Sequence, residues 1–116
     1  MKIATDLHQA RVLADILPLE SADMHYAFSA IAGESFQEVV DASATLLPGN
    51  KNKRFPFECA CSLSALLDYL SANFRVTIKY LDNHWELDCR VQIMYSKELV
   101  DACYEMVLKL YEQKLL

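Results

Sequence analysis

Residues 74 to 93 carry two apolar alternations that meet at a turn, and this pattern constrains the fold more than any other feature. Apolar residues occupy every second position on both sides of Asp82 and Asn83: Phe74, Val76, Ile78 and Tyr80, then Trp85, Leu87, Cys89, Val91 and Ile93. A period of two is typical of a strand with one buried face. A two-residue turn sets these pairs opposite one another: Leu81 and His84, Tyr80 and Trp85, Lys79 and Glu86, Ile78 and Leu87, Val76 and Cys89. The sequence therefore predicts an antiparallel hairpin, 74–81 with 85–94, in a unique register.

The composition is typical of one compact domain. With 116 residues, 53% of them hydrophobic, two glycines and three prolines, the chain can bury a single core and has no room for a second domain. The formal net charge of −5 repels a phosphate backbone, so we do not expect nucleic acid as a partner. The first residues are polar, and no apolar run reaches the roughly 18 residues of a membrane helix. We therefore expect a cytoplasmic protein without membrane contact, whose four cysteines are reduced thiols.

Three further segments show the apolar spacing of amphipathic helices. The first covers 6–17, with Thr5 as its predicted N-cap, and the second covers 62–72, with Ser62 as its predicted N-cap. The third covers 97–113 and carries two apolar stripes side by side. Such a wide apolar face favours contact with a sheet and also with a neighbouring subunit.

A shorter alternation at Met24, Tyr26 and Phe28 predicts a strand near 24–28. The segment 35–47 fits a helix or strands, and both alternatives stay open. The predicted fold class is α+β, in a single domain 1–116. A small antiparallel sheet, made of the 74–81/85–94 hairpin plus the strand near 24–28, is covered on one face by helices 6–17, 62–72 and 97–113.

Three stretches of the sequence carry a resemblance to a known group of proteins. They contain LPLESADM at 17–24, CSLSALL at 61–67 and DACYEM at 101–106. In these stretches the chain resembles short uncharacterised proteins found in gut bacteria and in their phages and mobile elements. Members often carry a proline and a tryptophan two positions apart before the middle helix, where this chain has Cys59 and Cys61. The resemblance implies an accessory protein of a mobile element and supplies no functional residues.

The four cysteines, Cys59, Cys61, Cys89 and Cys103, equal in number the ligands of a structural zinc site. They lack the C-x2-C spacing of zinc knuckles, and the last two fall within apolar stripes, which indicates buried core thiols. A thiol before the 62–72 helix would be stabilised as a thiolate, but no histidine is near in sequence and no glycine-rich turn prepares an oxyanion hole. We therefore expect no metal site, no cofactor and no catalytic residues.

Seven residues are candidates for binding: Asp23, His25, Lys51, Lys53, Arg54, Tyr104 and Tyr111. The first two lie in a polar junction, where His25 is expected to point to solvent and Asp23 to make a turn hydrogen bond. The three bases are followed by aromatic residues, a combination that can grip a phosphate or an acidic protein surface but also keeps a loop solvated. The two tyrosines lie on the last helix, at the edge of a core or at an interface.

Together these features favour a small non-enzymatic protein-binding accessory module of phage or mobile-element origin. The wide aromatic helix and the lack of a catalytic constellation support this prediction, and the expected partner is a protein, with a homodimer as one form. The alternative is a small-molecule or nucleotide-binding protein, or an enzyme, with a pocket near residues 21–25 and the hairpin.

Overall fold

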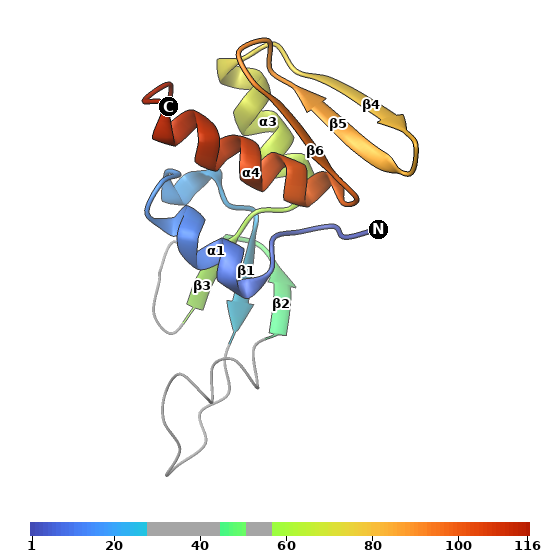
Figure 1. Ribbon diagram of the computed structural model, residues 1–116. Helices are drawn as coiled ribbons and strands as arrows, with labels where there is room; N and C mark the ends of the chain where they lie inside the picture. Colours follow the sequence, from blue (N-terminus) through green and yellow to red (C-terminus); the bar gives the residue numbers. More distant parts are fainter. Residues whose placement is uncertain (28–44, 51–56) are drawn as a thin grey trace. The chain divides into compact units, whose positions relative to one another are not determined.

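The computed structural model describes residues 1–27, 45–50 and 57–116 (Figure 1). The elements follow in this order: α1 Leu7–Ala14, the 3-10 helix η1 Leu19–Ser21, β1 Met24–Ala27, β2 Thr45–Pro48, β3 Phe57–Ala60, α3 Leu63–Asn73, β4 Thr77–Leu81, β5 His84–Asp88, β6 Ile93–Ser96 and α4 Leu99–Glu112. They form two compact units, one of residues 6–61 and one of residues 1–5 with 62–116, named here the 6–61 unit and the hairpin unit. Helices stand beside two small antiparallel sheets, so the predicted α+β class is confirmed.

The 6–61 unit contains a three-stranded antiparallel sheet in the order β2-β1-β3, and α1 packs against β3. In the central strand, Met24 lies opposite Pro48 on one side and Ala60 on the other. The strand predicted near 24–28 is confirmed as β1, but its partners are β2 and β3 rather than the hairpin. The prediction of one sheet is wrong because each partner strand has only four residues, too few to establish a period in the sequence.

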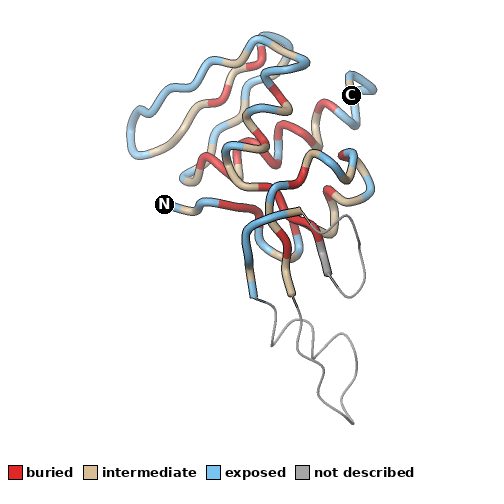
Figure 2. Tube along the Cα trace, turned by 180° about the vertical axis from the view of Figure 1, so that it is seen from behind, coloured by how far each residue is buried: buried red, intermediate tan, exposed pale blue. Residues whose placement is uncertain are grey.

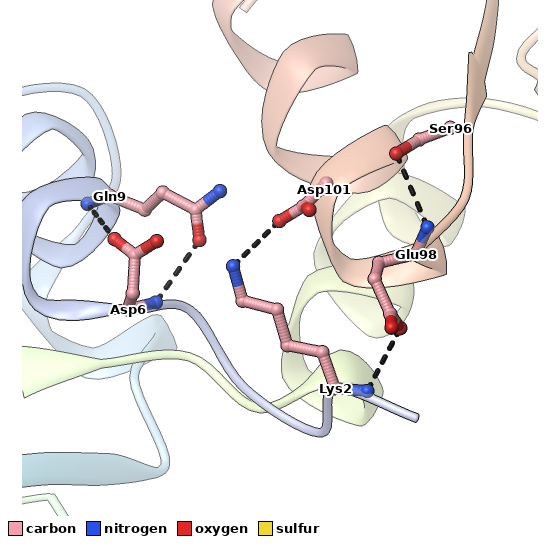
Figure 3. Close-up of polar contacts among 6 residues, drawn as sticks. All are labelled: Lys2, Asp6, Gln9, Ser96, Glu98 and Asp101. Atoms are coloured by element: carbon pink, nitrogen blue, oxygen red, sulfur yellow. Dashed lines mark hydrogen bonds and ion pairs between the residues drawn. The ribbon is translucent and has the colours of Figure 1, made fainter.

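Helix α1 begins after Asp6, one residue later than the predicted cap at Thr5. The Asp6 carboxylate accepts a hydrogen bond from the Gln9 backbone N–H at 2.8 Å, and the Gln9 side chain accepts one from the Asp6 N–H at 3.0 Å (Figure 3). This reciprocal capping box satisfies two N–H groups that a helix start otherwise leaves unpaired.

Replacing Asp6 with alanine removes this cap, and we expect the free energy of unfolding to fall by about 1 kcal/mol. Chemical denaturation followed by circular dichroism measures the change. The control is Asp15→Ala at the C-cap of the same helix, where a carboxylate is unfavourable to the helix dipole and its loss is expected to leave stability unchanged or slightly higher. Equal destabilisation by both variants would contradict the capping role.

The hairpin unit contains the second sheet, in the order β4-β5-β6, and α4 packs against β5, β6 and α3 (Figure 1). Its fully buried side chains are Leu66, Leu70, Leu87, Val100, Ala102, Cys103, Met106, Val107 and Leu110, all at 0% exposure. Most of them belong to α3 and α4, so the wide apolar face predicted for the last helix is covered within the chain. Ser62 caps α3 as predicted, accepting a hydrogen bond from the Ala65 N–H at 3.2 Å.

The register of the hairpin is confirmed from Thr77 to Asp88. Within that span each predicted pair is observed: Ile78 with Leu87, Lys79 with Glu86, Tyr80 with Trp85, Leu81 with His84. Asp82 and Asn83 form the two-residue turn with φ values of 54° and 63°. Two consecutive positive φ angles are typical of the hairpin turn whose twist matches that of its strands, and aspartate and asparagine tolerate this conformation best after glycine.

The second strand of the hairpin is shorter than predicted, because β5 ends at Asp88 and the chain turns before β6. The Cys89 N–H donates to the Gln92 carbonyl at 3.0 Å, and the Arg90 N–H donates to the Asp88 carboxylate at 2.6 Å. Arg90 has a φ of 70°, which breaks the strand conformation without a glycine. The prediction of one strand over 85–94 is therefore wrong, and the chain forms two antiparallel strands there.

The apolar face of the hairpin is only partly buried. Leu87 and Cys89 are 0% and 2% exposed, whereas Ile78 and Tyr80 are 38% and 57% exposed. The cause is the position of α4, which contacts β5 and β6 while β4 lies at the outer edge of the sheet (Figure 1). Figure 2 shows β4 exposed along its whole length. The prediction that the entire face is covered is therefore wrong for β4.

Residues 1–5 form an arm that belongs to the hairpin unit. Ala4 pairs with Ser62 in an antiparallel bridge, and the Leu63 N–H donates to the Ile3 carbonyl at 2.8 Å. Lys2 reaches the start of α4: its N–H donates to the Glu98 carboxylate at 2.9 Å, and its ammonium group lies 2.7 Å from the Asp101 carboxylate (Figure 3). The arm thus joins the beginning of the chain to the starts of α3 and α4.

Candidate functional site

Exposed apolar side chains gather on the sheet of the hairpin unit. Of the eleven large hydrophobic residues that are exposed in the described part of the chain, six lie between β4 and β6: Ile78, Tyr80, Leu81, Val91, Ile93 and Tyr95. Large exposed apolar clusters are uncommon on proteins that have no binding partner. This sheet is therefore the strongest candidate for a functional surface.

The strand register divides these side chains between two faces, since residues directly opposite one another in a sheet share a face. The inner face carries the buried Leu87, together with Ile78, Tyr80, Trp85 and Met94. The outer face carries Thr77, Lys79, Leu81, His84, Glu86, Asp88, Ile93 and Tyr95. We use "outer face" for these eight residues below.

Tyr95 lies on the outer face, on the edge strand β6. Its ring is 59% exposed and meets the His84 ring edge to face, with 5.7 Å between the ring centroids. Glu86 lies directly across from Tyr95 on β5. Local desolvation raises the pKa of the Tyr95 hydroxyl, and the charge of Glu86 and its hydrogen bond raise it further. The phenol is therefore a neutral hydrogen-bond donor at neutral pH, beside an imidazole and a carboxylate.

The remaining outer-face residues place charge on the middle strand and apolar groups on both edge strands. Leu81 on β4 and Ile93 on β6 are 67% and 40% exposed. Glu86 and Asp88 give β5 two carboxylates, and Lys79 on β4 gives the face one ammonium group. Aromatic residues such as Tyr95 are enriched at protein–protein interfaces.

Two of the sequence-predicted binding residues, Asp23 and His25, lie in the 6–61 unit. Asp23 is exposed, and its carbonyl accepts a hydrogen bond from the Gly49 N–H at 2.8 Å. His25 is only 2% exposed, and its Nδ1 lies 2.8 Å from the Gly49 carbonyl oxygen. The expectation that His25 points to solvent is therefore wrong. It belongs to the central strand of its sheet, where a backbone carbonyl supplies the polar partner that a buried imidazole requires.

Asn50 connects three parts of the 6–61 unit. Its amide group donates to the carbonyls of Leu19 and Ala22, at 2.8 Å and 2.9 Å. Its side-chain oxygen accepts a weak hydrogen bond from the Cys59 thiol at 3.7 Å. Since η1, β1 and β3 are separated along the chain, this single side chain holds the turn before β1 against the β3 strand.

The buried thiols have the properties of core residues. Burial raises the pKa of Cys61 to about 12, and the nearby charge of Asp23 adds to the effect. Burial likewise raises the pKa of Cys103 to about 12, and it raises the pKa of Cys89. Only a thiolate acts as a nucleophile or metal ligand. These three thiols are neutral at neutral pH, which favours the structural interpretation over a catalytic or metal-binding one.

A small cavity lies in the 6–61 unit between α1, η1 and β3. Its volume is about 20 Å³, and its lining includes Leu13, Leu17, Ser21 and the thiol-bearing Cys59 and Cys61. A space of this size holds one water molecule, whereas sites for drug-sized ligands measure roughly 300 Å³ or more. The cavity reaches Ser21 and Ala22 of the pocket predicted near residues 21–25 and the hairpin, but no hairpin residue lines it, and it is too small for a nucleotide.

The other predicted binding residues fall outside the described residues or in the hairpin unit. Lys51, Lys53 and Arg54 lie outside the described residues. Tyr104 and Tyr111 are both on α4 in the hairpin unit, where Tyr104 is buried at 7% exposure and Tyr111 is 50% exposed. Of these two tyrosines, only Tyr111, near the end of α4, therefore presents an exposed aromatic side chain.

Sequence reasoning missed the outer face because of the turn between β5 and β6. The predicted alternation places Ile93 on the same side as Leu87, whereas the four-residue turn reverses the parity, so that Met94 lies opposite Leu87. One sequence signal indicates this turn: the polar residues Asp88, Arg90 and Gln92 interrupt the strand. An aspartate side chain can accept a hydrogen bond from the backbone N–H two residues further on, as Asp88 does here.

Across residues 1–27, 45–50 and 57–116, no three histidine, cysteine or acidic side chains are grouped so as to hold a metal ion. Within the same ranges, no helix combines the length and apolar character that crossing a membrane requires. The comparisons with known proteins add no relative: no family model, no curated protein and no solved structure matches the chain.

Proposed function

We propose that this protein is a non-enzymatic protein-binding module that docks its partner on the outer face of the β4-β5-β6 sheet. The observation that carries the proposal is the gathering of exposed apolar and aromatic side chains on this one small sheet. Tyrosine is a frequent centre of binding energy at protein interfaces, and Tyr95 stands on this surface beside His84. The proposed interface therefore has an aromatic anchor on β6, on the same strand and face as the aliphatic Ile93.

Charge defines the chemistry of the proposed partner. The outer face carries Glu86 and Asp88 against Lys79, and the whole chain has a net charge of −5. Complementary potentials speed association and exclude wrong partners. We propose a partner protein whose contact surface carries lysine or arginine opposite β5 and apolar groups opposite Ile93 and Tyr95.

The proposed setting is the cytoplasm, in an accessory role for a phage or mobile element. Its support is the sequence resemblance described above, together with neutral buried thiols of the kind that persist in a reducing compartment. A small-molecule function has less support, because the cavity in the 6–61 unit holds only about one water molecule.

The double variant Ile93→Ser with Tyr95→Ala tests the proposal, since it removes the apolar side chains that β6 contributes to the outer face. The purified chain is immobilised and exposed to bacterial lysate, and the captured proteins are quantified by mass spectrometry. We expect one protein to bind the wild type at near-stoichiometric level and the double variant at least about tenfold less, as for loss of an interface hot spot.

The matched control is Tyr111→Ala, which removes an equally exposed tyrosine from the end of α4. The control should capture the same protein as the wild type. If no captured protein distinguishes the double variant from the control, the outer face is not the docking site.

A further inference from the structure

The β4 strand has an open edge. It pairs with β5 on one side only, and all five of its residues are exposed. The other edge strand, β6, has alternating exposure and packs against α4. Exposed edges of this kind are templates for pairing with another strand.

The hairpin turn determines which backbone groups are free on this edge. In a two-residue hairpin the pair that flanks the turn, here Leu81 and His84, is hydrogen-bonded, and hydrogen-bonded pairs then alternate along the ladder. Lys79 and Thr77 therefore direct their N–H and C=O groups toward β5. Ile78 and Tyr80 direct theirs outward, away from the sheet.

A second copy of the same strand fits this edge in one antiparallel register. A register centred on Ile78 sets the two Ile78 residues opposite each other, and it places the outward-pointing groups of both copies in hydrogen-bonding positions. The flanking pairs between the copies are Thr77 with Lys79, Val76 with Tyr80, and Arg75 with Leu81. None of these pairs opposes two like charges.

The neighbouring registers are less favourable. A register centred on Lys79 brings the two ammonium groups directly opposite each other, which destabilises a strand pair. A register centred on Tyr80 sets Ile78 against Asp82, so that the pairing runs into the turn.

We propose that two copies of this chain pair through their β4 strands, with Ile78 at the two-fold axis. The pairing explains why Ile78 and Tyr80, which lie on the apolar inner face beyond the reach of α4, remain 38% and 57% exposed in a single copy. The result is a six-stranded antiparallel sheet. The edge is short compared with standard interfaces, so the dimer dissociates with a constant on the order of micromolar.

The dimer also has a consequence for partner binding, which rests on the function proposed above. A two-fold axis perpendicular to the sheet places both outer faces on the same side of the six strands. Two docking surfaces then form one continuous surface with two Tyr95 anchors. A partner that carries two matching sites gains affinity through the effective concentration of the second site.

Cysteine cross-linking tests the register. In the proposed pairing the two Cα atoms of residue 78 lie about 5.5 Å apart, within the range of a disulfide. The two Cα atoms of residue 80 are offset by four residues along the strands, or roughly 13 Å. Under mild oxidation we expect the Ile78→Cys variant to form a disulfide-linked dimer. We expect the Tyr80→Cys variant to form no covalent dimer. The wild type measures the background, because its four native thiols are buried.

Sedimentation velocity over a range of concentrations tests the dimer without cysteines. We expect the wild type to dimerise, and Ile78→Lys to dimerise at least about tenfold more weakly, because it sets two added charges opposite each other. Val91→Lys, at an exposed apolar position in the β5–β6 turn, is the matched control and should dimerise like the wild type.

A wild type that stays monomeric, cross-linking of the Tyr80 variant instead of the Ile78 variant, or equal cross-linking of both would overturn the proposal. The outer-face double variant separates this inference from the proposed function. If it dimerises normally but no partner distinguishes it from its control, the proposed function fails and the dimer stands. If partner capture depends on the outer face while the chain is monomeric, the dimer fails alone.

Discussion

Replacing Leu87 with alanine is expected to lower the free energy of unfolding by about 2 to 5 kcal/mol. Leu87 is 0% exposed and lies on the middle strand of its sheet, on the face that α4 covers. Truncation removes the transfer free energy of three methyl or methylene groups and leaves a cavity. Surrounding side chains, including the buried Met106 and Val107 of α4, are part of a packed core that relaxes only in part.

Urea denaturation, followed by the fluorescence of the single tryptophan, measures this loss. The control is Leu81→Ala on the neighbouring strand, where the same side chain is 67% exposed. We expect that control to change stability by about 0.5 kcal/mol or less, as for most surface positions. Equal losses for the two leucines would mean that the inner face of this sheet is not packed as described.

The second large effect is expected at Asn50, whose replacement by alanine should destabilise the protein by roughly 1 to 3 kcal/mol. The carbonyls of Leu19 and Ala22 both lose their amide donor, and the Leu19 carbonyl keeps the backbone N–H of Ala22 at 3.3 Å. A partly buried carbonyl that loses its donor costs about 1 to 3 kcal/mol. Asn50→Asp should cost at least as much, because it removes the donors and adds an anion beside carbonyl oxygens.

The chain offers a matched control for this prediction. The amide of Asn73 also donates to a carbonyl, that of Tyr69 at 2.9 Å, but at an exposed site within one helix. Asn73→Ala is expected to change the free energy of unfolding by about 0.5 kcal/mol or less. Thermal and urea unfolding of all three variants compare the two amides, and an Asn50→Ala variant as stable as Asn73→Ala would contradict the bridging role.

The sequence was sufficient for the hairpin register because two independent signals agree there. The apolar alternation before Asp82 and after Asn83 has opposite parity, and only a two-residue turn between them sets apolar residues against apolar residues. The helix positions were also predictable, since α3 and α4 have long apolar stripes and α3 has a serine cap. Long periodic segments carry enough repeats to be recognised.

Short strands and their partners were not predictable in the same way. β2 and β3 have four residues each, and the pairing of β1 with them joins positions 18 or more residues apart. Such pairing depends on the packed chain rather than on local periodicity. The turn at Arg90 was missed for a related reason: a non-glycine residue with positive φ leaves little trace in the sequence.

The outer face could be recognised from the sequence only if all three strands of its sheet were predicted correctly. The hairpin prediction covered β4 and β5, but the missed turn assigned Ile93 to the inner face, so the outer face was not recognised. His25 was predicted as exposed because it alternates with Met24 and Tyr26, and the structure buries the polar member of that alternation. Burial of a histidine can be inferred only when its hydrogen-bond partner is known, and the Gly49 carbonyl comes from another strand end.

The arm of residues 1–5 has a consequence for the order of events during synthesis. Residues 1–5 are synthesised before their partners, because Ser62 and Leu63 follow them at mid-sequence and Glu98, before α4, lies 96 residues beyond Lys2. Residues 6–61 are synthesised before α4, so their sheet can assemble before the contacts between the arm and α4 exist. Closing so long a loop makes the contacts of Lys2 with Glu98 and Asp101 among the last to form, which links them to the synthesis of α4.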